Sequence, residues 1–200
     1  MPKACQKELV LETARTLILA DGYDAVTVRQ IARQAELTTG AIYSNYRNKA
    51  EILGILVTES WELLRGEIQS KVLKEPDLKR RLRLFFNSYR DYSRSHPEHF
   101  TLLLYMASHP EVFAELSEEV QRDIIARRAE LVNRMIELVD AMKAQGCLKD
   151  VDSTTYVIAL ISTANGLLQS RSRSLYSQYG VDMDRVDDLI MGRLIDSVCN

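Results

Sequence analysis

Apolar residues recur at helical spacing along most of this 200-residue chain. In the first such stretch, residues 4–20, Val10, Ala14, Leu17 and Ile18 form one face, as in an amphipathic helix. Similar patterns predict further helices over residues 28–35, 39–46, 49–73, 76–95, 117–145, 152–178 and 182–198. No segment alternates between apolar and polar residues in the way that predicts a strand. The pattern therefore predicts an all-α fold.

Glycine, proline and capping residues indicate where these helices begin and end. Gly22 follows the first helix, at a position where a left-handed backbone favours glycine. Thr27 can cap the second helix, and Thr38 or Thr39 can cap the third. Pro76 stands where we expect the first residue of another helix.

The two short helices over residues 28–35 and 39–46 carry the functional interpretation. A break at residues 36–38 separates them, and Ile42 and Tyr46 would be the inward residues of the second. Two helices joined by such a turn make a helix-turn-helix, whose second helix can enter a major groove. The outer residues of that helix are mostly small or hydroxyl-bearing, so its backbone can approach the groove closely.

The distribution of charge along the chain agrees with a DNA-binding site in its first 50 residues. The whole chain has a net charge of −2. Residues 1–50, however, carry seven Lys and Arg against five Asp and Glu, and residues 51–200 are net acidic. Phosphate contacts require local positive charge rather than a basic whole protein.

Composition indicates the cellular setting. No apolar run approaches the roughly 18 residues that a membrane span needs, and the N-terminus has no apolar segment of the secretory type. We therefore expect a cytoplasmic protein that does not enter a membrane. Glycine (8) and proline (4) are scarce, which favours long helices.

Residues 9–53 resemble the DNA-binding domain of the tetracycline-repressor (TetR) family of bacterial transcriptional regulators. The matching residues are Thr27-Val28-Arg29-Gln30-Ile31-Ala32, Ala35, Leu37, Thr39-Gly40-Ala41-Ile42-Tyr43, Tyr46 and Lys49. The resemblance implies a helix-turn-helix DNA-binding domain over residues 1–48 and a helical ligand-binding and dimerisation domain over residues 49–200. It also implies a ligand-responsive homodimer, usually a repressor, that binds a palindromic operator in double-stranded DNA.

Carried over by position, the resemblance implies a set of DNA-contacting residues. Base-edge contacts fall to Thr39, Gly40 and Ser44, with Arg29 as a further candidate, and phosphate contacts to Thr38, Tyr43, Asn45 and Lys49. The chain departs from the family at Asn45, often an aromatic residue or histidine, and at Arg47, commonly proline. Arg47 adds a cation near phosphate.

The resemblance further implies that the last two long helices pair two chains in a four-helix bundle. Residues 152–178 and 182–198 have wide apolar faces and a short connection, which permits such pairing. The same faces could instead close the core of a single chain.

In the family, a small-molecule effector lies inside the C-terminal helices. The candidates here are Trp61, Phe86, Tyr89, Tyr105, Asn165 and Gln169. Such a set suits a largely apolar molecule with a few polar anchors, although the same aromatic residues could form an ordinary core.

Other functions find little support in the sequence. His96, His99 and His109 lack metal-ligand spacing because Pro97 starts a helix between the first two, so we expect neither a metal nor a cofactor. We find no HExxH, GxSxG or Walker loop and no ExxH pair of di-iron spacing, and expect no enzyme. The alternative is a helical protein-binding adaptor that does not bind DNA.

Overall fold

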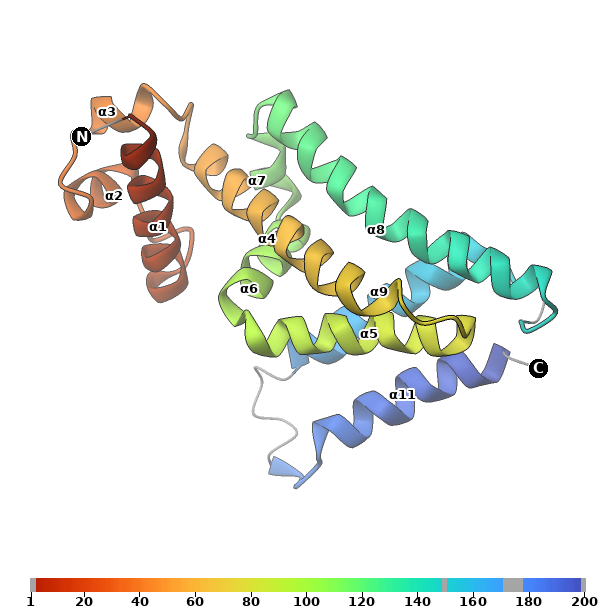
Figure 1. Cartoon of the computed structure of the whole chain (residues 1–200). Coiled ribbons are helices and arrows are strands. Elements are labelled where there is room, and N and C mark those ends of the chain that lie inside the picture. The colour runs from red at the N-terminus through yellow and green to blue at the C-terminus, as the bar shows by residue number, and fades with distance from the viewer. Residues whose placement is uncertain (1–2, 149–150, 171–177, 199–200) are drawn as a thin grey trace. The chain divides into compact units, whose positions relative to one another are not determined.

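A computed structural model describes residues 3–148, 151–170 and 178–198, and it is all-α (Figure 1). The helices are α1 (Lys3–Asp21), α2 (Val28–Gln34), α3 (Thr39–Tyr43), α4 (Lys49–Val72), α5 (Leu78–Ser95), α6 (Pro97–Ser108), α7 (Pro110–Ala114), α8 (Glu118–Ala144), α9 (Ser153–Ser170) and α11 (Met183–Val198). No strand occurs within these ranges. The predicted fold class is therefore confirmed. Of the helix predicted over residues 152–178, residues 171–177 lie outside the described part.

The helices pack into two compact units. The first unit comprises Met1–Leu63 with His96–Arg127, and the second comprises Leu64–Ser95 with Arg128–Asn200. Helices α4 and α8 each contribute residues to both units. This division follows packing, so the functional boundary that we place between residues 48 and 49 stays a prediction.

Capping residues fix the ends of the short helices in the first unit. Gly22 adopts a left-handed backbone with φ of 84°. The Thr27 hydroxyl oxygen accepts from the Gln30 N–H at 3.2 Å, and the Gln30 side chain accepts from the Thr27 N–H at 2.8 Å, which makes a capping box at α2. The Thr38 hydroxyl oxygen accepts from the Ala41 N–H at 3.1 Å and caps α3. The caps expected from Thr27 and Thr38 are confirmed.

Helix α3 is shorter than the predicted range 39–46, because side chains occupy its C-terminal acceptor. Ser44 Oγ and Asn45 Nδ2 donate to the Ala41 carbonyl at 2.8 and 3.0 Å. A longer helix would pair this carbonyl with the Asn45 N–H, which donates instead to Ile42 at 2.9 Å. Such side-chain bonds compete with the helical ladder.

Helix α5 begins at Leu78, and the predicted start at Pro76 is wrong. The Asp77 carboxylate accepts from the Arg80 N–H at 2.7 Å, so Asp77 acts as the cap. Pro76 therefore lies before the cap rather than in the first turn. In contrast, Pro97 and Pro110 do occupy the first turns of α6 and α7.

The second unit has an apolar core and a charged seam between α5 and α11. Its core residues include Leu82, Phe85 and Tyr92 of α5, Met135 and Met142 of α8, and Val157 and Leu160 of α9. Ion pairs join α5 to α11, among them Arg83 with Asp196 at 2.6 Å and Arg90 with Asp188 at 2.8 Å.

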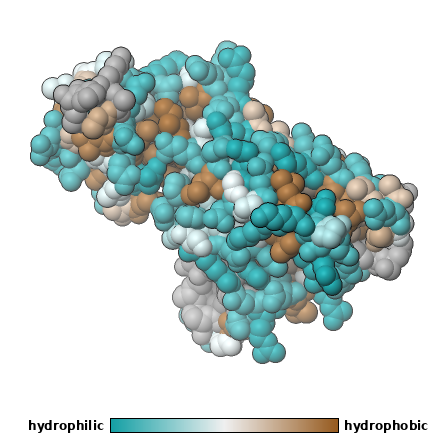
Figure 2. Space-filling view, in the orientation of Figure 1, coloured by the Kyte–Doolittle hydropathy of each residue, from teal (hydrophilic) through white to brown (hydrophobic). Residues whose placement is uncertain are grey.

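The surface seen in Figure 2 is largely hydrophilic, with smaller apolar areas between the polar residues. None of the helices in the described ranges combines the length and the apolar character needed to cross a bilayer.

In the first unit, α4 packs closely at Gly54 on Leu116 and on Val120 of α8. Ile52, Leu53 and Leu56 of α4 are fully buried. A Cβ atom added at Gly54 would lie 2.7 Å from Val120 Cγ1 and 2.8 Å from a Leu116 methyl group. A larger residue at this position would require the side chains of Val120 and Leu116 to move.

Gly54→Ala is expected to destabilise the protein by about 1–3 kcal/mol, because the new methyl group overpacks a filled core. Gly66→Ala is the matched control, since the same helix has nothing within 4 Å of a Cβ at Gly66. The control should unfold as wild type does, or be more stable by up to ~1 kcal/mol from helix propensity. Urea unfolding followed by circular dichroism compares the two, and equal free energies of unfolding would contradict this account.

Candidate nucleic-acid interface

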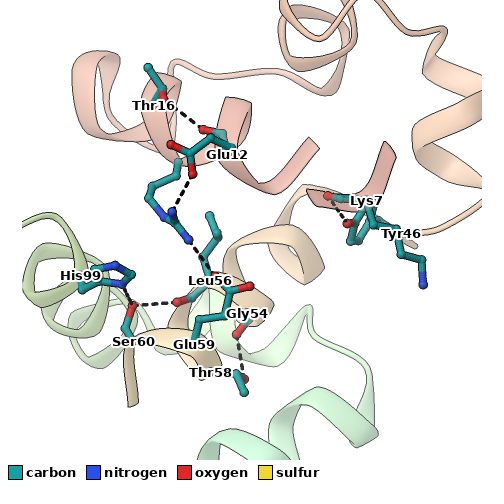
Figure 3. Close-up of polar contacts among 11 residues, drawn as sticks. Lys7, Glu12, Thr16, Tyr46, Gly54, Leu56, Thr58, Glu59, Ser60 and His99 are labelled. Carbon is teal, nitrogen blue, oxygen red and sulfur yellow. Dashed lines mark hydrogen bonds and ion pairs between the residues drawn. The ribbon is translucent and has the colours of Figure 1, made fainter. Parts of the chain in front are cut away.

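Helix α3 turns its apolar residues inward and leaves a thin outer face. Ile42 and Tyr46 are 1% and 3% exposed. The Tyr46 hydroxyl donates to the Lys7 carbonyl of α1 at 3.1 Å (Figure 3). Burial, with Glu59 nearby, raises the pKa of Tyr46 to about 12, so this hydroxyl remains a donor at neutral pH. The hydrogen bond from Tyr46 to Lys7 therefore holds the end of the helix-turn-helix against α1.

The outer face of α3 exposes the residues predicted to approach DNA. Thr38, Gly40, Tyr43 and Ser44 are exposed, Thr39 and Asn45 are partly exposed, and Arg29 is exposed on α2. Tyr43 is 56% exposed, which is unusual for a large aromatic side chain.

Gly40 lies on this face where the fold does not demand glycine. A Cβ built there would meet only the Thr38 hydroxyl, at 3.8 Å. Glycine costs a helix roughly 0.8–1.0 kcal/mol relative to alanine, so its presence here needs another reason. A backbone that must come close to another molecule supplies one.

The hydroxyl groups of Thr38 and Tyr43 can donate outward. Thr38 uses its oxygen as the acceptor in its cap, and the hydroxyl hydrogen is left for another partner. The Tyr43 hydroxyl belongs to an exposed side chain. Both groups suit contacts to phosphate oxygens.

Ser44 and Asn45 make hydrogen bonds within the helix-turn-helix. Both donate to the Ala41 carbonyl, and Asn45 Nδ2 also donates to Ser44 Oγ at 3.2 Å. Both N–H groups of the Asn45 amide are therefore used locally. Their DNA contacts stay predictions: donation from the Asn45 amide to a phosphate would require these bonds to rearrange, whereas Ser44 Oγ can still accept one hydrogen bond.

Lys49 binds the loop between α1 and α2. Its ammonium donates to the carbonyls of Tyr23 and Val26 at 2.7 and 2.8 Å and lies 3.9 Å from the Tyr23 ring centroid. Burial lowers the pKa of Lys49, although Asp24 and Glu115 oppose the shift. A phosphate contact from Lys49 stays a prediction, because two of its three N–H groups hold the loop.

Tyr105, predicted as a ligand contact, lies against the same loop. Its ring is 5.4 Å from that of Tyr23 and stacks on His109 at 3.9 Å. Its hydroxyl donates to Asp24 at 3.5 Å, and His109 Nδ1 donates to the Tyr105 carbonyl at 2.8 Å. Tyr105 of α6, stacked on His109, therefore contacts the loop that enters the helix-turn-helix.

The start of α4 is fixed to the corner between α7 and α8. Asn48 caps α4 by accepting from the Glu51 N–H at 2.8 Å, and it donates to the Glu115 carbonyl at 3.0 Å. The Ser117 hydroxyl donates to Glu51 at 2.8 Å. Sequence reasoning missed Asn48, although an Asn directly before a helical stripe is a common cap signal.

The other predicted ligand residues divide between the two units. Trp61 is half-buried in the first unit. Phe86 and Tyr89 line a cavity of about 360 Å³ in the second unit, formed by α5, α9 and α11. Asn165 accepts a hydrogen bond from the Tyr89 hydroxyl at 2.7 Å, and Gln169 is exposed. The structure thus brings together Phe86 and Tyr89 at the cavity, with Asn165 behind Tyr89.

His99 joins α6 to α4 through a buried serine. Ser60 is 0% exposed and donates to the Leu56 carbonyl at 2.7 Å, so its oxygen accepts from His99 Nδ1–H at 2.9 Å (Figure 3). Burial lowers the pKa of His99, as does the nearby Arg15. In the described part of the chain, no group of three or more His, Cys, Asp or Glu could hold a metal.

This histidine makes stability depend on pH. Its pKa in the unfolded chain is about 6.5 and is lower in the folded protein. The contribution of neutral His99 to the free energy of unfolding is therefore complete above pH ~6.5, and it is lost as the pH falls toward the pKa of His99 in the folded protein. His99→Gln keeps a donor for Ser60 and should flatten the fall in urea midpoint between pH of about 7.5 and 5. Identical pH profiles for variant and wild type would contradict this assignment.

Sequence comparison identifies the helix-turn-helix region. Residues 10–54 match the family described as bacterial regulatory proteins, tetR family. A comparison with curated proteins gives no match.

Solved structures resemble the chain over nearly its whole length. A TetR family transcriptional regulator, PfmR from Thermus thermophilus, is 22% identical with a TM-score of 0.73, covering 94% of this chain and 97% of its own. A tetR-family regulatory protein from Rhodococcus RHA1 is 18% identical with a TM-score of 0.77, covering 98% of each chain. AibR, solved with isovaleryl coenzyme A and operator DNA, is 21% identical with a TM-score of 0.74, covering 95% and 98%. At these identities the likeness establishes the fold.

Proposed function

We propose, from the match of residues 10–54 to the tetR family of bacterial regulatory proteins, that this chain belongs to that family and is a homodimeric repressor of transcription. It binds a palindromic operator through α3 and leaves the operator when a small, largely apolar effector binds. Members of the family are transcriptional regulators rather than enzymes. The protein acts in the cytoplasm, where its DNA lies.

The observation that carries this proposal is the thin, exposed face of α3. Gly40 is exposed where the fold accepts a larger residue, and the neighbouring Thr38 and Tyr43 offer outward donors. A short helix with such a face can press its backbone into a major groove about 12 Å wide. Thr39, Gly40 and Ser44, with Arg29, face the bases, while Thr38, Tyr43, Asn45 and Lys49 bind phosphates.

Dimerisation through α9 and α11 completes the DNA-binding unit. Ile158 of α9 is 48% exposed and Leu189 of α11 is 58% exposed. Burying both in a partner would remove apolar surface from water. A two-fold dimer places its recognition helices about 34–36 Å apart on successive major grooves.

An effector acts by differential binding. A ligand that binds better to a dimer with another recognition-helix spacing lowers DNA affinity by the same coupling free energy. Helix α4 is suited to carry this coupling because it begins directly after the helix-turn-helix and contributes to both compact units. The neighbour AibR was solved with both a coenzyme A thioester and operator DNA, which supports a small-molecule effector here.

A gel-shift assay with the DNA upstream of the chain's own gene tests the proposal. We expect binding to a palindromic segment that weakens steeply as salt rises, because phosphate contacts release counterions. A protein-binding adaptor, the competing function, would show no salt-sensitive binding to any such segment, and that result would reject the regulator.

Gly40→Ala tests the face of α3 directly. The added methyl group should leave stability unchanged or raise it by up to ~1 kcal/mol, yet lower operator affinity by about tenfold or more by separating backbone and base edges. Gly66→Ala introduces the same change far along α4 and should bind DNA as wild type does. Fluorescence anisotropy with labelled operator measures both. Wild-type affinity in Gly40→Ala would contradict close approach at this residue.

A further inference from the structure

The cavity of the second unit combines an apolar lining with charged residues. Phe86, Leu167, Leu168 and Ile195 line it and are at most 9% exposed. Arg83 and Arg90 of α5 also line the cavity, as do Asp187 and Asp188 of α11. Its volume of about 360 Å³ lies within the range of small-molecule sites. This is the chemistry of a site for a molecule with an apolar body and a charged head.

Arg90 is the charged group built into the wall of this cavity. Its side chain is only 21% exposed, while its partner Asp188 is 71% exposed. The Arg90 Nη1 donates to Asp188 Oδ1 at 2.8 Å. The Arg90 Nε–H, however, is buried and has no hydrogen-bond acceptor among the described residues.

A buried N–H without an acceptor destabilises the folded protein, and does so more when the group is charged. Such a donor therefore calls for an explanation. An anionic oxygen in the cavity would satisfy Nε–H if Arg90 turned away from Asp188, since Nε is buried in the present arrangement, and a carboxylate or phosphate could then accept from two N–H groups of the planar guanidinium. The present partner of Arg90, Asp188, is exposed, so an anionic ligand could replace it.

We propose that this cavity binds an amphipathic anion, with its carboxylate or phosphate head on Arg90 and its apolar body against Phe86, Leu167, Leu168 and Ile195. The head displaces Asp188, which can move into water because it is exposed. This assignment rests on the proposed function in taking the anion as the effector, and it names the effector's chemical class.

Two groups on the cavity wall have unmet hydrogen-bonding capacity. Arg83 is paired with Asp196 outside the lining, at 2.6 Å, whereas Arg90 has an unsatisfied donor at Nε. Asp187 also lines the cavity, is 4% exposed and interacts within the protein, but its buried Oδ1 accepts no hydrogen bond from the described residues. The Arg90 donor calls for an anionic oxygen, and the decylammonium probe below tests whether the Asp187 oxygen selects a cation instead.

The bound anion would also act on the attachment of α11. Arg90 with Asp188, Arg83 with Asp196 and Arg94 with Asp184 join α5 to α11 along one seam. Displacing Asp188 removes one of these links from a helix that we assign to dimerisation. The ligand therefore competes with a contact that holds α11 in its present position.

Calorimetry on the full-length protein without DNA tests the assignment with three probes of equal chain length: decanoate, 1-decanol and decylammonium. Decanoate should bind at least about tenfold more tightly than decanol, since its carboxylate makes a charge-assisted hydrogen bond to Arg90 and the neutral hydroxyl of decanol does not. Arg90→Met keeps the side-chain stem and should abolish this preference. Arg128→Gln, an exposed arginine of α8, is the control and should bind as wild type does.

Asp188→Asn supplies a gain-of-binding test that misfolding cannot imitate. Removing the competing carboxylate should strengthen decanoate binding several-fold and leave decanol binding unchanged. Tighter binding of decylammonium than of decanoate, or equal decanoate binding by wild type and Arg90→Met, would overturn the proposal. Because DNA is absent, a failure here leaves the regulator intact, and failed operator binding leaves the anion site intact.

Discussion

A very short helix cannot hold its shape alone in water, because helix nucleation costs more than so few hydrogen bonds return. Helix α3, with five residues, is such a helix, and it exists only because its surroundings fix both its ends and its inner face. Thr38 caps its start, the side chains of Ser44 and Asn45 donate to the Ala41 carbonyl, and Ile42 is buried beneath it. The outer face of α3 thus depends on contacts made by residues other than those predicted to contact DNA.

Those contacts extend along α4 and into α6 and α7. Lys49 holds the loop before α2 by two carbonyls, and Tyr105, stacked on His109, lies against Tyr23 of that loop. Asn48 and Gly54 bring α4 onto the corner of α7 and α8. The helix-turn-helix is consequently supported by elements far along the chain, which gives a signal from those elements a physical path to α3.

The sequence predicted features that arise from local chemistry. Helix periodicity and the caps at Thr27 and Thr38 follow from residues close in the chain, and the structure confirms them. Two predicted helix boundaries were wrong because of side-chain hydrogen bonds to the backbone. Asp77 caps α5 and moves its start to Leu78, and the Asn45 side chain occupies the Ala41 carbonyl at the end of α3. Tertiary contacts could not be predicted from the sequence, because no spacing rule pairs Lys49 with Val26 or Tyr89 with Asn165. The charged seam of α5 and α11 required their antiparallel register, which sequence alone does not provide.

We propose that so small a DNA-contacting surface requires two copies of the chain acting together. The direct measurement compares affinity and stoichiometry, by anisotropy and analytical ultracentrifugation, on a palindromic operator selected by this protein from random DNA and on its isolated half-site. The account predicts two chains on the palindrome and a loss of affinity of about a hundredfold or more on the half-site. One chain per site with equal affinity for both DNAs would contradict it.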